Sequence, residues 1–335
     1  MDKLRVGVWL QEGYKPTVGG GYGYYTSMVE AIGGYSFAQA EVVFLTDTPV
    51  AVSHIGNKRV LVVTPPPRMA WHHRLLRAIS FKVPGLGWLK ARYRHRDMRA
   101  DNVLTDVLYA HCDLIYYLVP GCRFPQFPYL YTLWDLGHLS TYAFPEWAQG
   151  GRFESRKAHH DILPHKALLV FCETEAGKQE AVAYLRINPA RIRVVPLIPA
   201  GLTAPAVSAV KPSGIGEGKS FIHYPAQYWA HKNHVGLLRA FREVLIENPS
   251  LYLVLCGGDQ GNYAYVKSQI RAMGLEQRVV DLGFIATEEL KWLYHHSRGL
   301  VMPTLLGPSN MPPLEALALG CPVAVSDLPG HRELL

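Results

Sequence analysis

Short apolar runs alternate with segments of helical spacing along the chain. Runs rich in β-branched residues predict strands, and apolar residues three or four apart predict the helices between them. The predicted strands before residue 200 are 4–10, 40–46, 59–64, 112–119, 128–135, 167–173 and 191–198. A second series follows at 220–226, 251–258, 278–284, 299–304 and 321–327. Because these runs are almost uniformly apolar, both faces of each sheet should be covered, which predicts parallel strands joined by helical crossovers.

The two series are separated by a stretch rich in Pro, Gly, Ser and Ala at 200–219, a composition typical of a linker. The pattern therefore predicts an α/β protein with two doubly wound Rossmann-like domains facing each other across a cleft. We expect an N-terminal domain at 1–203, a linker at 204–218 and a C-terminal domain at 219–335. In such sheets ligands bind beyond the carboxyl ends of the strands, so we expect the functional residues in the loops there.

Composition and charge narrow the class of protein. The chain has 335 residues, of which 49% are hydrophobic and 18% charged, as in ordinary globular proteins. Its net charge of +7 favours anionic partners such as phosphates, nucleic acid or an acidic membrane surface. The five cysteines are scattered without a CxxC pair, which favours reduced thiols in the cytosol. No apolar run reaches the ~18 residues of a membrane span, and the first residues read as a strand rather than a signal peptide.

The segment 72–99 is strongly basic and carries interleaved apolar residues. This combination predicts contact with an anionic lipid surface, with a solvated basic helical hairpin as the alternative. We do not expect this segment to bind nucleic acid.

A glycine-rich turn at 16–23 lies between the first strand and a helix. Glycines let a backbone approach a ligand closely, and helix N-termini attract anions. The stretch is not a dinucleotide fingerprint, because Tyr24 stands where the last glycine of GxGxxG belongs. Asp47, at the end of the second strand, keeps a nicotinamide-dependent oxidoreductase open as a weaker interpretation. A flexible loop without a ligand is the other alternative.

Two charged residues follow strands of the second series. Lys232 precedes a helix that starts near His234, and an ammonium beside the backbone N–H groups of a helix start can hold a diphosphate. Taken alone, it could equally be a surface lysine. Glu315 is expected in the first turn of a helix entered through Pro312 and Pro313. There it could accept two ribose hydroxyls or simply complement the helix dipole.

The loop after the strand at 128–135 carries Trp134, Asp135 and His138. His138 is a candidate acid or base because histidine titrates near neutral pH, although a structural role is the alternative. Asp135 could take part in the chemistry or cap the following turn.

Taken together, these stretches resemble retaining glycosyltransferases of the GT-B fold, in particular family 4 and its mannosyltransferase and O-antigen branch. The resemblance follows the chain in order and is strongest in the final stretch, which resembles the family signature EGFGLPPLEAMACGCPVV. The similar stretches are PTVGGGYGYY, TLWDLGHLSTYAFPEW, VFCETEAGKQEAV, INPARIRVVPLIPA, YPAQYWAHKNH, DLGFIATEEL and GPSNMPPLEALALGCPVAVSD.

The resemblance implies transfer of a sugar from GDP-mannose or a UDP-sugar to a lipid-linked or polysaccharide acceptor, with retention at the anomeric carbon. It implies no metal, because positive charge and backbone dipoles would stabilise the leaving diphosphate. It also implies a cytoplasmic enzyme, peripheral at the inner face of the membrane. The implied catalytic residues are Asp135, His138 and Lys232. The implied donor-binding residues are Gly20, Gly21, Gln227, Lys232, Gly283, Phe284, Ile285, Asn310, Met311 and Glu315.

In that assignment each group of residues meets one part of the donor. Lys232 binds the diphosphate and Glu315 the ribose, while 283–285 contact the base. The backbone N–H groups of 310 and 311 contact the sugar, and the glycines at 20 and 21 approach the phosphate or the acceptor.

The sequence departs from the family at three polar positions. Gly307 replaces a glutamate that touches the donor sugar, Trp134 replaces a histidine, and Gln227 replaces an arginine beside the diphosphate. His138, His231 or His234 could compensate. These losses keep open a second interpretation, a non-catalytic GT-B protein that binds nucleotide and serves as a partner or scaffold. Because the family continues beyond its signature, we also expect the C-terminal domain to be incomplete at Leu335.

Overall fold

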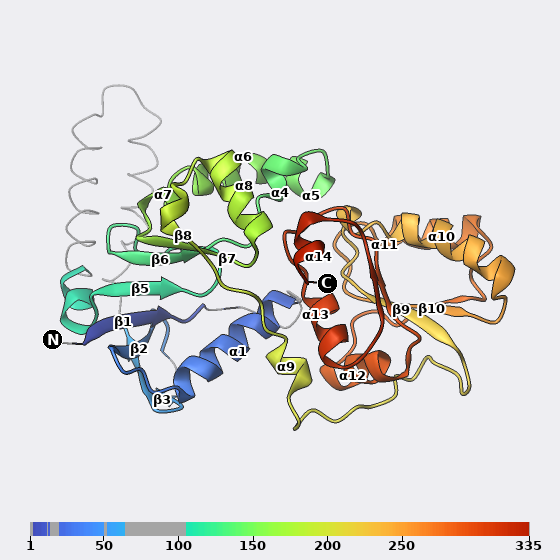
Figure 1. The fold of residues 1–335 in the computed structure, drawn as a ribbon, viewed down its shortest axis with the longest axis horizontal. Coiled ribbons are helices and arrows are strands. Elements are labelled where there is room, and N and C mark those ends of the chain that lie inside the picture. Colours follow the sequence, from blue (N-terminus) through green and yellow to red (C-terminus); the bar gives the residue numbers. More distant parts are fainter. Residues whose placement is uncertain (1–2, 12, 14–19, 50–51, 64–104, 335) are drawn as a thin grey trace, which may run out of the picture. The chain divides into compact units, whose positions relative to one another are not determined.

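The computed structural model describes residues 3–11, 13, 20–49, 52–63 and 105–334 (Figure 1). Contacts divide the chain into two compact units, one of residues 1–13 and 29–131 and the other of 14–28 and 132–335. The predicted domain limits at 203 and 219 stay predictions. The basic segment 72–99 lies outside the described residues.

The first unit contains a largely parallel sheet with strand order β3-β4-β2-β1-β5-β6. Its strands are β1 (Leu4–Trp9), β2 (Ala40–Thr46), β3 (His54–Ile55), β4 (Lys58–Val62), β5 (Leu114–Tyr117) and β6 (Tyr129–Thr132). Each predicted strand of this part is present, and β3 is an addition to the prediction. It pairs antiparallel to β4 across Gly56, whose φ of 58° suits a tight hairpin turn that favours glycine.

The second unit begins its sheet structure with two parallel strands, β7 (Leu169–Cys172) and β8 (Ile192–Val194). Short helices surround them, because Gly and Pro recur in this stretch and interrupt long helices. They are α4 (Gly137–Ser140), α5 (Pro145–Ala148), α6 (Arg152–His160), α7 (Leu163–Lys166), α8 (Glu175–Leu185), the 3₁₀ turn η2 (Pro189–Arg191) and α9 (Ala200–Thr203). The longer helix α1 (Gly20–Gly34) has residues in both units. Between α9 and β9, the described residues form no helix or strand.

A five-stranded parallel sheet, ordered β11-β10-β9-β12-β13, fills the rest of the second unit. Its strands are β9 (Phe221–Pro225), β10 (Tyr252–Cys256), β11 (Val279–Asp281), β12 (Leu300–Met302) and β13 (Val323–Val325). The helices between and after them are the 3₁₀ turn η3 (Ala230–Lys232), α10 (His234–Glu247), α11 (Tyr263–Ala272), α12 (Thr287–His296), α13 (Met311–Ala318) and α14 (Pro329–Leu334).

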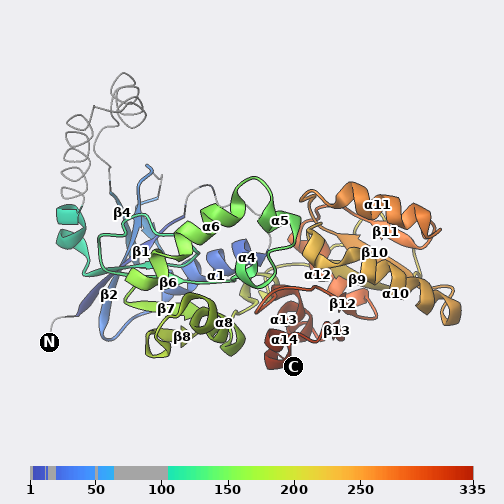
Figure 2. The same cartoon turned by 90° about the horizontal axis from the view of Figure 1, so that it is seen from above.

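The two faces of this sheet are covered by different helices (Figures 1 and 2). Leu238 and Phe241 of α10 and Val266 of α11 pack in one core cluster with Leu253. Leu293 of α12 packs with Val254, the next residue of β10, whose side chain points the other way. Alternate residues of one strand therefore face different helices, which explains the uniformly apolar strand sequences.

The strand order also fixes where a ligand can enter. From β9 the chain moves outward through β10 to β11, then crosses back to β12 and β13 on the other side. Right-handed crossovers in opposite directions place their helices on opposite faces. The loops after β9 and β12 therefore diverge, and this switch point is where open α/β sheets bind ligands.

Within the described residues, no helix is both long enough and apolar enough to cross a membrane.

Candidate functional site

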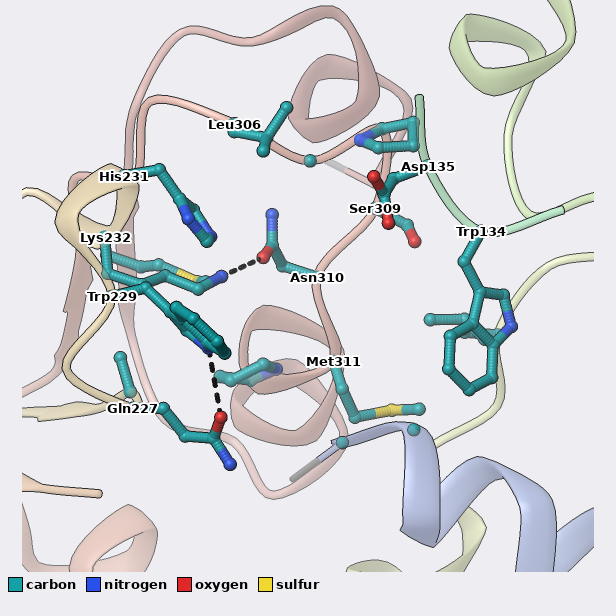
Figure 3. A pocket seen from close by; sticks show the side chains of 18 of the residues that line it. Trp134, Asp135, Gln227, Trp229, His231, Lys232, Leu306, Ser309, Asn310 and Met311 are labelled. Atoms are coloured by element: carbon teal, nitrogen blue, oxygen red, sulfur yellow. Dashed lines mark hydrogen bonds between the residues drawn. The ribbon is translucent and has the colours of Figure 1, made fainter. Parts of the chain in front are cut away.

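A cavity of about 350 Å³ lies at this switch point, and every residue that lines it belongs to the second unit (Figure 3). The lining combines the ends of β9 and β12 with the starts of α1 and α13 and the loop after β6. Of the predicted site residues, it contains Gly20, Gly21, Asp135, Gln227, Lys232, Asn310 and Met311. The predicted residues that do not line it are His138, Gly283, Phe284, Ile285 and Glu315.

Local structure holds Lys232 at the edge of the sheet. It ends the 3₁₀ turn η3, and its carbonyl accepts a hydrogen bond of 2.9 Å from the hydroxyl of Tyr224 in β9. Asn233 follows with a φ of 54°, a conformation that asparagine tolerates better than most residues. The Asn233 side chain caps α10 by accepting from the amide of Gly236, and donates to the carbonyl of Pro303. Asn233 therefore joins the loop after β9, which carries Lys232, to the loop after β12.

The ammonium of Lys232 belongs to a chain of three side chains. It donates to Oδ1 of Asn310 over 2.9 Å. Because an ammonium can only donate, the Asn310 amide must turn its NH₂ group toward Nε2 of His331, which lies 2.9 Å away. Nε2 then accepts, so the His331 proton sits on Nδ1 and is donated to the carbonyl of Ser326 over 2.8 Å. Burial lowers the pKa of His331, which agrees with a neutral ring.

Burial also lowers the pKa of Lys232 to about 8, although Asp135 and Glu146 favour its charged form. A lysine with so little water around its charge gains more from an anionic ligand than an exposed lysine does.

Carboxyl groups form the opposite part of the lining. Asp135 accepts from the backbone amide of Gly137 at 2.9 Å and from Arg156 at 2.8 Å, so the predicted capping role is present together with its place in the cavity. Glu173, at the end of β7, accepts from the hydroxyl of Ser309. Burial and the nearby Asp135 raise the pKa of Glu173 to about 8, so this side chain is neutral at pH 7.

His138 does not face the cavity. Its side chain is 0% exposed, and its Nδ1 accepts from Nε of Arg156 at 3.4 Å. Burial, together with repulsion by Arg156 and His160, lowers the pKa of His138 to about 4. His138 therefore has the structural role that was the alternative prediction, because a side chain outside the cavity cannot act as acid or base on a substrate bound there.

The expectation that Glu315 lies in the first turn of its helix is wrong. Helix α13 begins at Met311, with Pro312 and Pro313 inside its first turn, so Glu315 falls in the second turn. The dipole effect is concentrated in the first turn, and the dipole interpretation therefore loses its basis. One carboxylate oxygen accepts from the hydroxyl of Tyr294 at 2.8 Å, and burial raises the pKa of Glu315 to about 7.

The predicted base-binding loop follows β11 at the same edge of the sheet. Asp281 accepts from the hydroxyls of Tyr228 and Tyr263, each at 2.8 Å, and from the amide of Gly283. Gly283 has a φ of 63°, which turns the chain sharply and leaves the side chain of Phe284 54% exposed. The loop is thereby tied to the one that carries Lys232, although it lies outside the cavity.

Two glycines occupy places where a side chain would not fit easily. A Cβ atom on Gly20 would stand 3.0 Å from Cβ of Met311, so the starts of α1 and α13 approach closely here. Gly307, which stands where the resembled family has a glutamate, has a φ of 127° and brings no polar side chain to the cavity. Gln227 accepts at Oε1 from the indole N–H of Trp229 over 3.1 Å and remains part of the lining.

Two carboxyl groups near the cavity were not among the predicted site residues. Glu173 stands in the VFCETEAGKQEAV stretch and Glu146 in the FPEW stretch, both of which carried the family resemblance. Glu173 is the last residue of a predicted strand and Glu146 follows a proline, and these positions could have marked both as candidate site residues. Their partners, Ser309 and His231, are more than eighty residues away in sequence, so only the fold brings each pair together.

Comparison with known proteins finds glycosyltransferases among those that part of this chain resembles. Residues 208–335 match the family described as glycosyl transferases group 1. An uncharacterized glycosyltransferase of Methanocaldococcus jannaschii is 28% identical over 122 residues, which cover 36% of this chain and 31% of that protein. The O-antigen chain mannosyltransferase RfbU of Salmonella typhimurium is 32% identical over 108 residues, which cover 32% and 30%. The chain thus matches about a third of the length of these curated relatives.

The fold extends beyond the matched segment. HepE of Anabaena, solved in complex with UDP and glucose, superposes with a TM-score of 0.62 at 17% identity, covering 99% of this chain and 83% of HepE. The predicted α/β fold of the GT-B type, with parallel sheets, is therefore confirmed.

Proposed function

We propose that this protein is a retaining glycosyltransferase of family 4 that moves a sugar from GDP-mannose or a UDP-sugar to a lipid-linked or polysaccharide acceptor. The observation that carries the proposal is Lys232, held by Asn310 at the switch point of a sheet whose sequence matches glycosyl transferases group 1. The names of the relatives support mannose as the sugar, and the HepE complex supports a uridine nucleotide.

In this proposal the donor diphosphate lies between Lys232 and the start of α13. Neither the Asn310 nor the Met311 backbone amide donates a hydrogen bond within the described residues. Two unsatisfied N–H groups beside an ammonium can hold phosphate or sugar oxygens. Gln227 takes the place of the family arginine at the diphosphate. Gly20 and Gly21 approach the phosphate or the acceptor, because no side chain intervenes.

The nucleoside extends from the cavity toward β11. Glu315 binds the ribose through the carboxylate oxygen that Tyr294 does not engage, and residues 283–285 contact the base, mainly through backbone groups. Since burial holds the pKa of Glu315 near 7, two ribose hydroxyls would favour its ionised form.

The charge that develops on the leaving diphosphate is stabilised by Lys232 and by the N-terminal end of α13. This arrangement requires no metal. We further propose a cytoplasmic location, with segment 72–99 on an anionic membrane surface that holds the lipid-linked acceptor.

A non-catalytic nucleotide-binding protein is the second candidate. Gly307 and Trp134 favour it, because they remove a carboxylate and a histidine that the family uses at the donor sugar. Transfer activity separates the two candidates, since both bind nucleotide.

The experiment is a thermal-shift screen of UDP-, GDP- and ADP-linked sugars, followed by a transfer assay with any donor that stabilises the protein. Lys232→Ala should weaken donor binding by roughly 10- to 150-fold, the ~1.5–3 kcal/mol of a charged hydrogen bond. Glu315→Ala should weaken the binding of both the free nucleotide and the sugar nucleotide. Lys166→Ala, an exposed lysine on α7, is the matched control.

The outcomes are distinct. If none of these donors stabilises the protein, the glycosyltransferase proposal fails. If a donor binds without transfer or hydrolysis, the non-catalytic candidate is favoured. If Lys232→Ala and Glu315→Ala bind the donor as well as the wild type does, the site assignment fails.

A further inference from the structure

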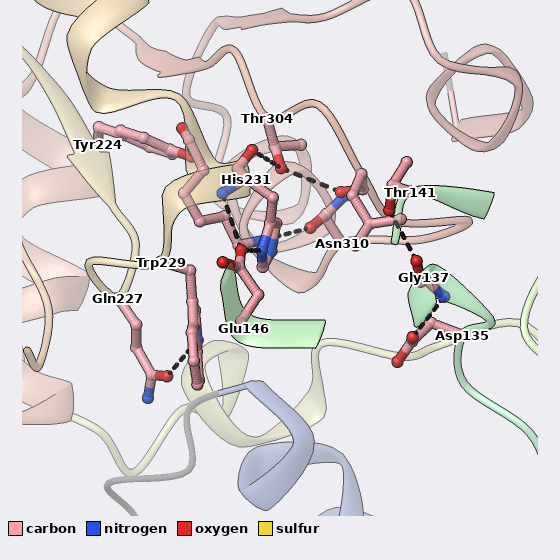
Figure 4. Close-up of polar contacts among 12 residues, drawn as sticks. Asp135, Gly137, Thr141, Glu146, Tyr224, Gln227, Trp229, His231, Thr304 and Asn310 are labelled. Carbon is pink, nitrogen blue, oxygen red and sulfur yellow. Dashed lines mark hydrogen bonds and ion pairs between the residues drawn. The ribbon is translucent and has the colours of Figure 1, made fainter. Parts of the chain in front are cut away.

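His231 lines the cavity and pairs with Glu146 of α5, a contact that the sequence did not predict (Figure 4). Glu146 of α5 is buried, with 5% of its surface exposed. Its Oε1 accepts from two donors of His231, the backbone N–H at 2.9 Å and Nδ1 at 2.5 Å. Two hydrogen bonds to one carboxylate oxygen fix both the loop and the direction of the ring.

The ring of His231 also stacks on two tryptophan rings. It stacks on Trp147 at 6.1 Å between centroids and 19° between planes, and on Trp229 at 6.4 Å and 21°. Because Nδ1 donates to Glu146, the neutral ring carries its lone pair on Nε2. No hydrogen bond to Nε2 forms within the described residues, and the ring points into the cavity near Lys232 and Asn310 (Figure 3).

The other ionisable groups of the lining are less suited to accept a proton. Asp135 is engaged by Arg156 and by a backbone amide. Glu173 already holds its proton at pH 7, since its pKa is raised to about 8. Lys232 is protonated at that pH. His231 is the one histidine among the described lining residues.

We propose that His231 is a catalytic base that accepts the proton of the acceptor hydroxyl during sugar transfer, and that Glu146 stabilises the imidazolium which results. This inference rests on the proposed function. The acceptor oxygen forms a bond to the anomeric carbon, and the bond from that carbon to the phosphate oxygen breaks. The diphosphate leaves with the electron pair, while the hydroxyl proton moves to Nε2. A buried carboxylate on Nδ1 favours this transfer because it offsets the new charge.

Five effects act on the charge of His231. Burial lowers its pKa most, and Lys232 lowers it further, whereas the hydrogen bond and charge of Glu146 and the charge of Asp135 raise it. The net shift is downward, so the ring is neutral and able to accept a proton at pH 7. For Glu146, burial raises the pKa, but the hydrogen bonds from His231 outweigh it and keep the carboxylate ionised.

The test uses variants that preserve the packing. In His231→Asn the amide NH₂ replaces Nδ1 as the donor to Glu146, but nothing replaces Nε2. In Glu146→Gln the acceptor oxygen remains and only the charge is lost. Nucleotide release from GDP-mannose and UDP-glucose, with water as the acceptor, is measured between pH 5 and 9. Thermal shift with GDP and UDP reports nucleotide binding separately.

We expect His231→Asn to lower kcat by roughly 10²- to 10⁴-fold, to abolish the acidic limb of the kcat/KM profile and to leave nucleotide binding unchanged. Glu146→Gln should shift that limb to lower pH. His159→Asn, an exposed histidine on α6, is the matched control and should behave as the wild type.

Wild-type rate and pH profile in His231→Asn would overturn the inference, as would a loss of nucleotide binding equal to the loss of rate, because His231 would then be a donor ligand. If His231→Asn does not fold, the pH shift in Glu146→Gln decides. Absence of donor binding and turnover in the wild type would instead reject the proposed function.

Discussion

At the scale of single residues, Lys232 carries its charge only up to a pH near 8. The folded-state pKa is lowered, so the ammonium is present below about pH 8 and is lost as the pH rises through it. Donor affinity should therefore fall about tenfold per pH unit above this value. Isothermal titration with UDP and GDP between pH 6.5 and 9.5 measures the effect.

Lys232→Arg is the matched control for this prediction, because a guanidinium stays charged throughout that range. Its affinity should be independent of pH. An equal pH dependence in the wild type and in Lys232→Arg would show that another group is responsible.

The orientation of the Asn310 amide gives a second prediction at this scale. In the wild type, Nε2 of His331 must accept from Asn310, so protonation of His331 opposes the contact with Lys232. Asn310→Asp replaces the donor by a carboxylate, which favours a protonated Nε2. NMR titration should therefore find the pKa of His331 below 6.5 in the wild type and above it in Asn310→Asp.

A spectrum of His331→Gln assigns the resonance. If the pKa of His331 is the same in the wild type and in Asn310→Asp, the deduced hydrogen-bond directions are wrong.

The sequence identified several donor-site candidates because charge beside a helix start has a physical meaning on its own. It identified Lys232 in this way, and Asn310 and Met311 through the family resemblance. It misplaced Glu315 by one turn because proline is tolerated inside the first turn of a helix, so a PP pair does not mark its first residue. It wrongly offered His138 as a candidate acid or base. The burial of this side chain depends on residues far away in sequence, so it could not be foreseen.

At the scale of elements, the start of α14 packs directly against the loop that carries Ser309 and Asn310. A Cβ atom on Gly330 would lie 1.6 Å from the carbonyl oxygen of Pro308. Gly330→Ala should therefore displace this loop, lowering the free energy of unfolding by about 1–3 kcal/mol and weakening donor binding. Urea unfolding and titration with UDP or GDP measure the two effects.

Gly23→Ala is the control, since no atom lies within 4 Å of a Cβ there and the residue is within α1. Alanine should stabilise the helix slightly. Donor binding as tight in Gly330→Ala as in Gly23→Ala would show that the loop does not need this contact.

Further contacts join both α14 and this loop to the start of α8. Glu333 of α14 accepts from the backbone amides of Glu175 and Ala176 at the start of α8, at 2.8 and 2.6 Å. Thr174 caps α8 through the amide of Gly177 and donates to the carbonyl of Pro308. These contacts hold the six-residue helix α14 against α8 and against the loop that carries Ser309 and Asn310. So short a helix would have little stability by itself.

At the scale of the whole molecule, the net charge of +7 and the basic segment 72–99 predict attraction to anionic lipid. Each basic residue near such a surface contributes about 1 kcal/mol. The protein should float with vesicles that contain phosphatidylserine, and less so at high salt. Charge reversal at Arg92, Arg94 and Arg96 should abolish flotation.

Vesicles of phosphatidylcholine alone are the control. Flotation that is unaffected by the charge reversals would remove the membrane proposal.

The strands were predictable from the sequence because their signals are local. Largely apolar runs of six to eight residues indicate strands covered on both faces, and β1, β2 and β9 to β13 all lie where such runs predicted them. The short antiparallel strand β3 was missed, since two residues are too few to show a period.

The sequence by itself determined the α/β class and the loops in which polar groups gather, because periodicity and turn chemistry act over a few residues. Only the tertiary structure decided which of those groups meet. The reversal of strand order between β9 and β12 opens the cavity and joins Lys232 to Asn310, and the contact of α5 with the loop after β9 places Glu146 on His231. Those pairs are far apart in the chain, so burial, pKa and hydrogen-bond direction arise only when the fold brings them into contact.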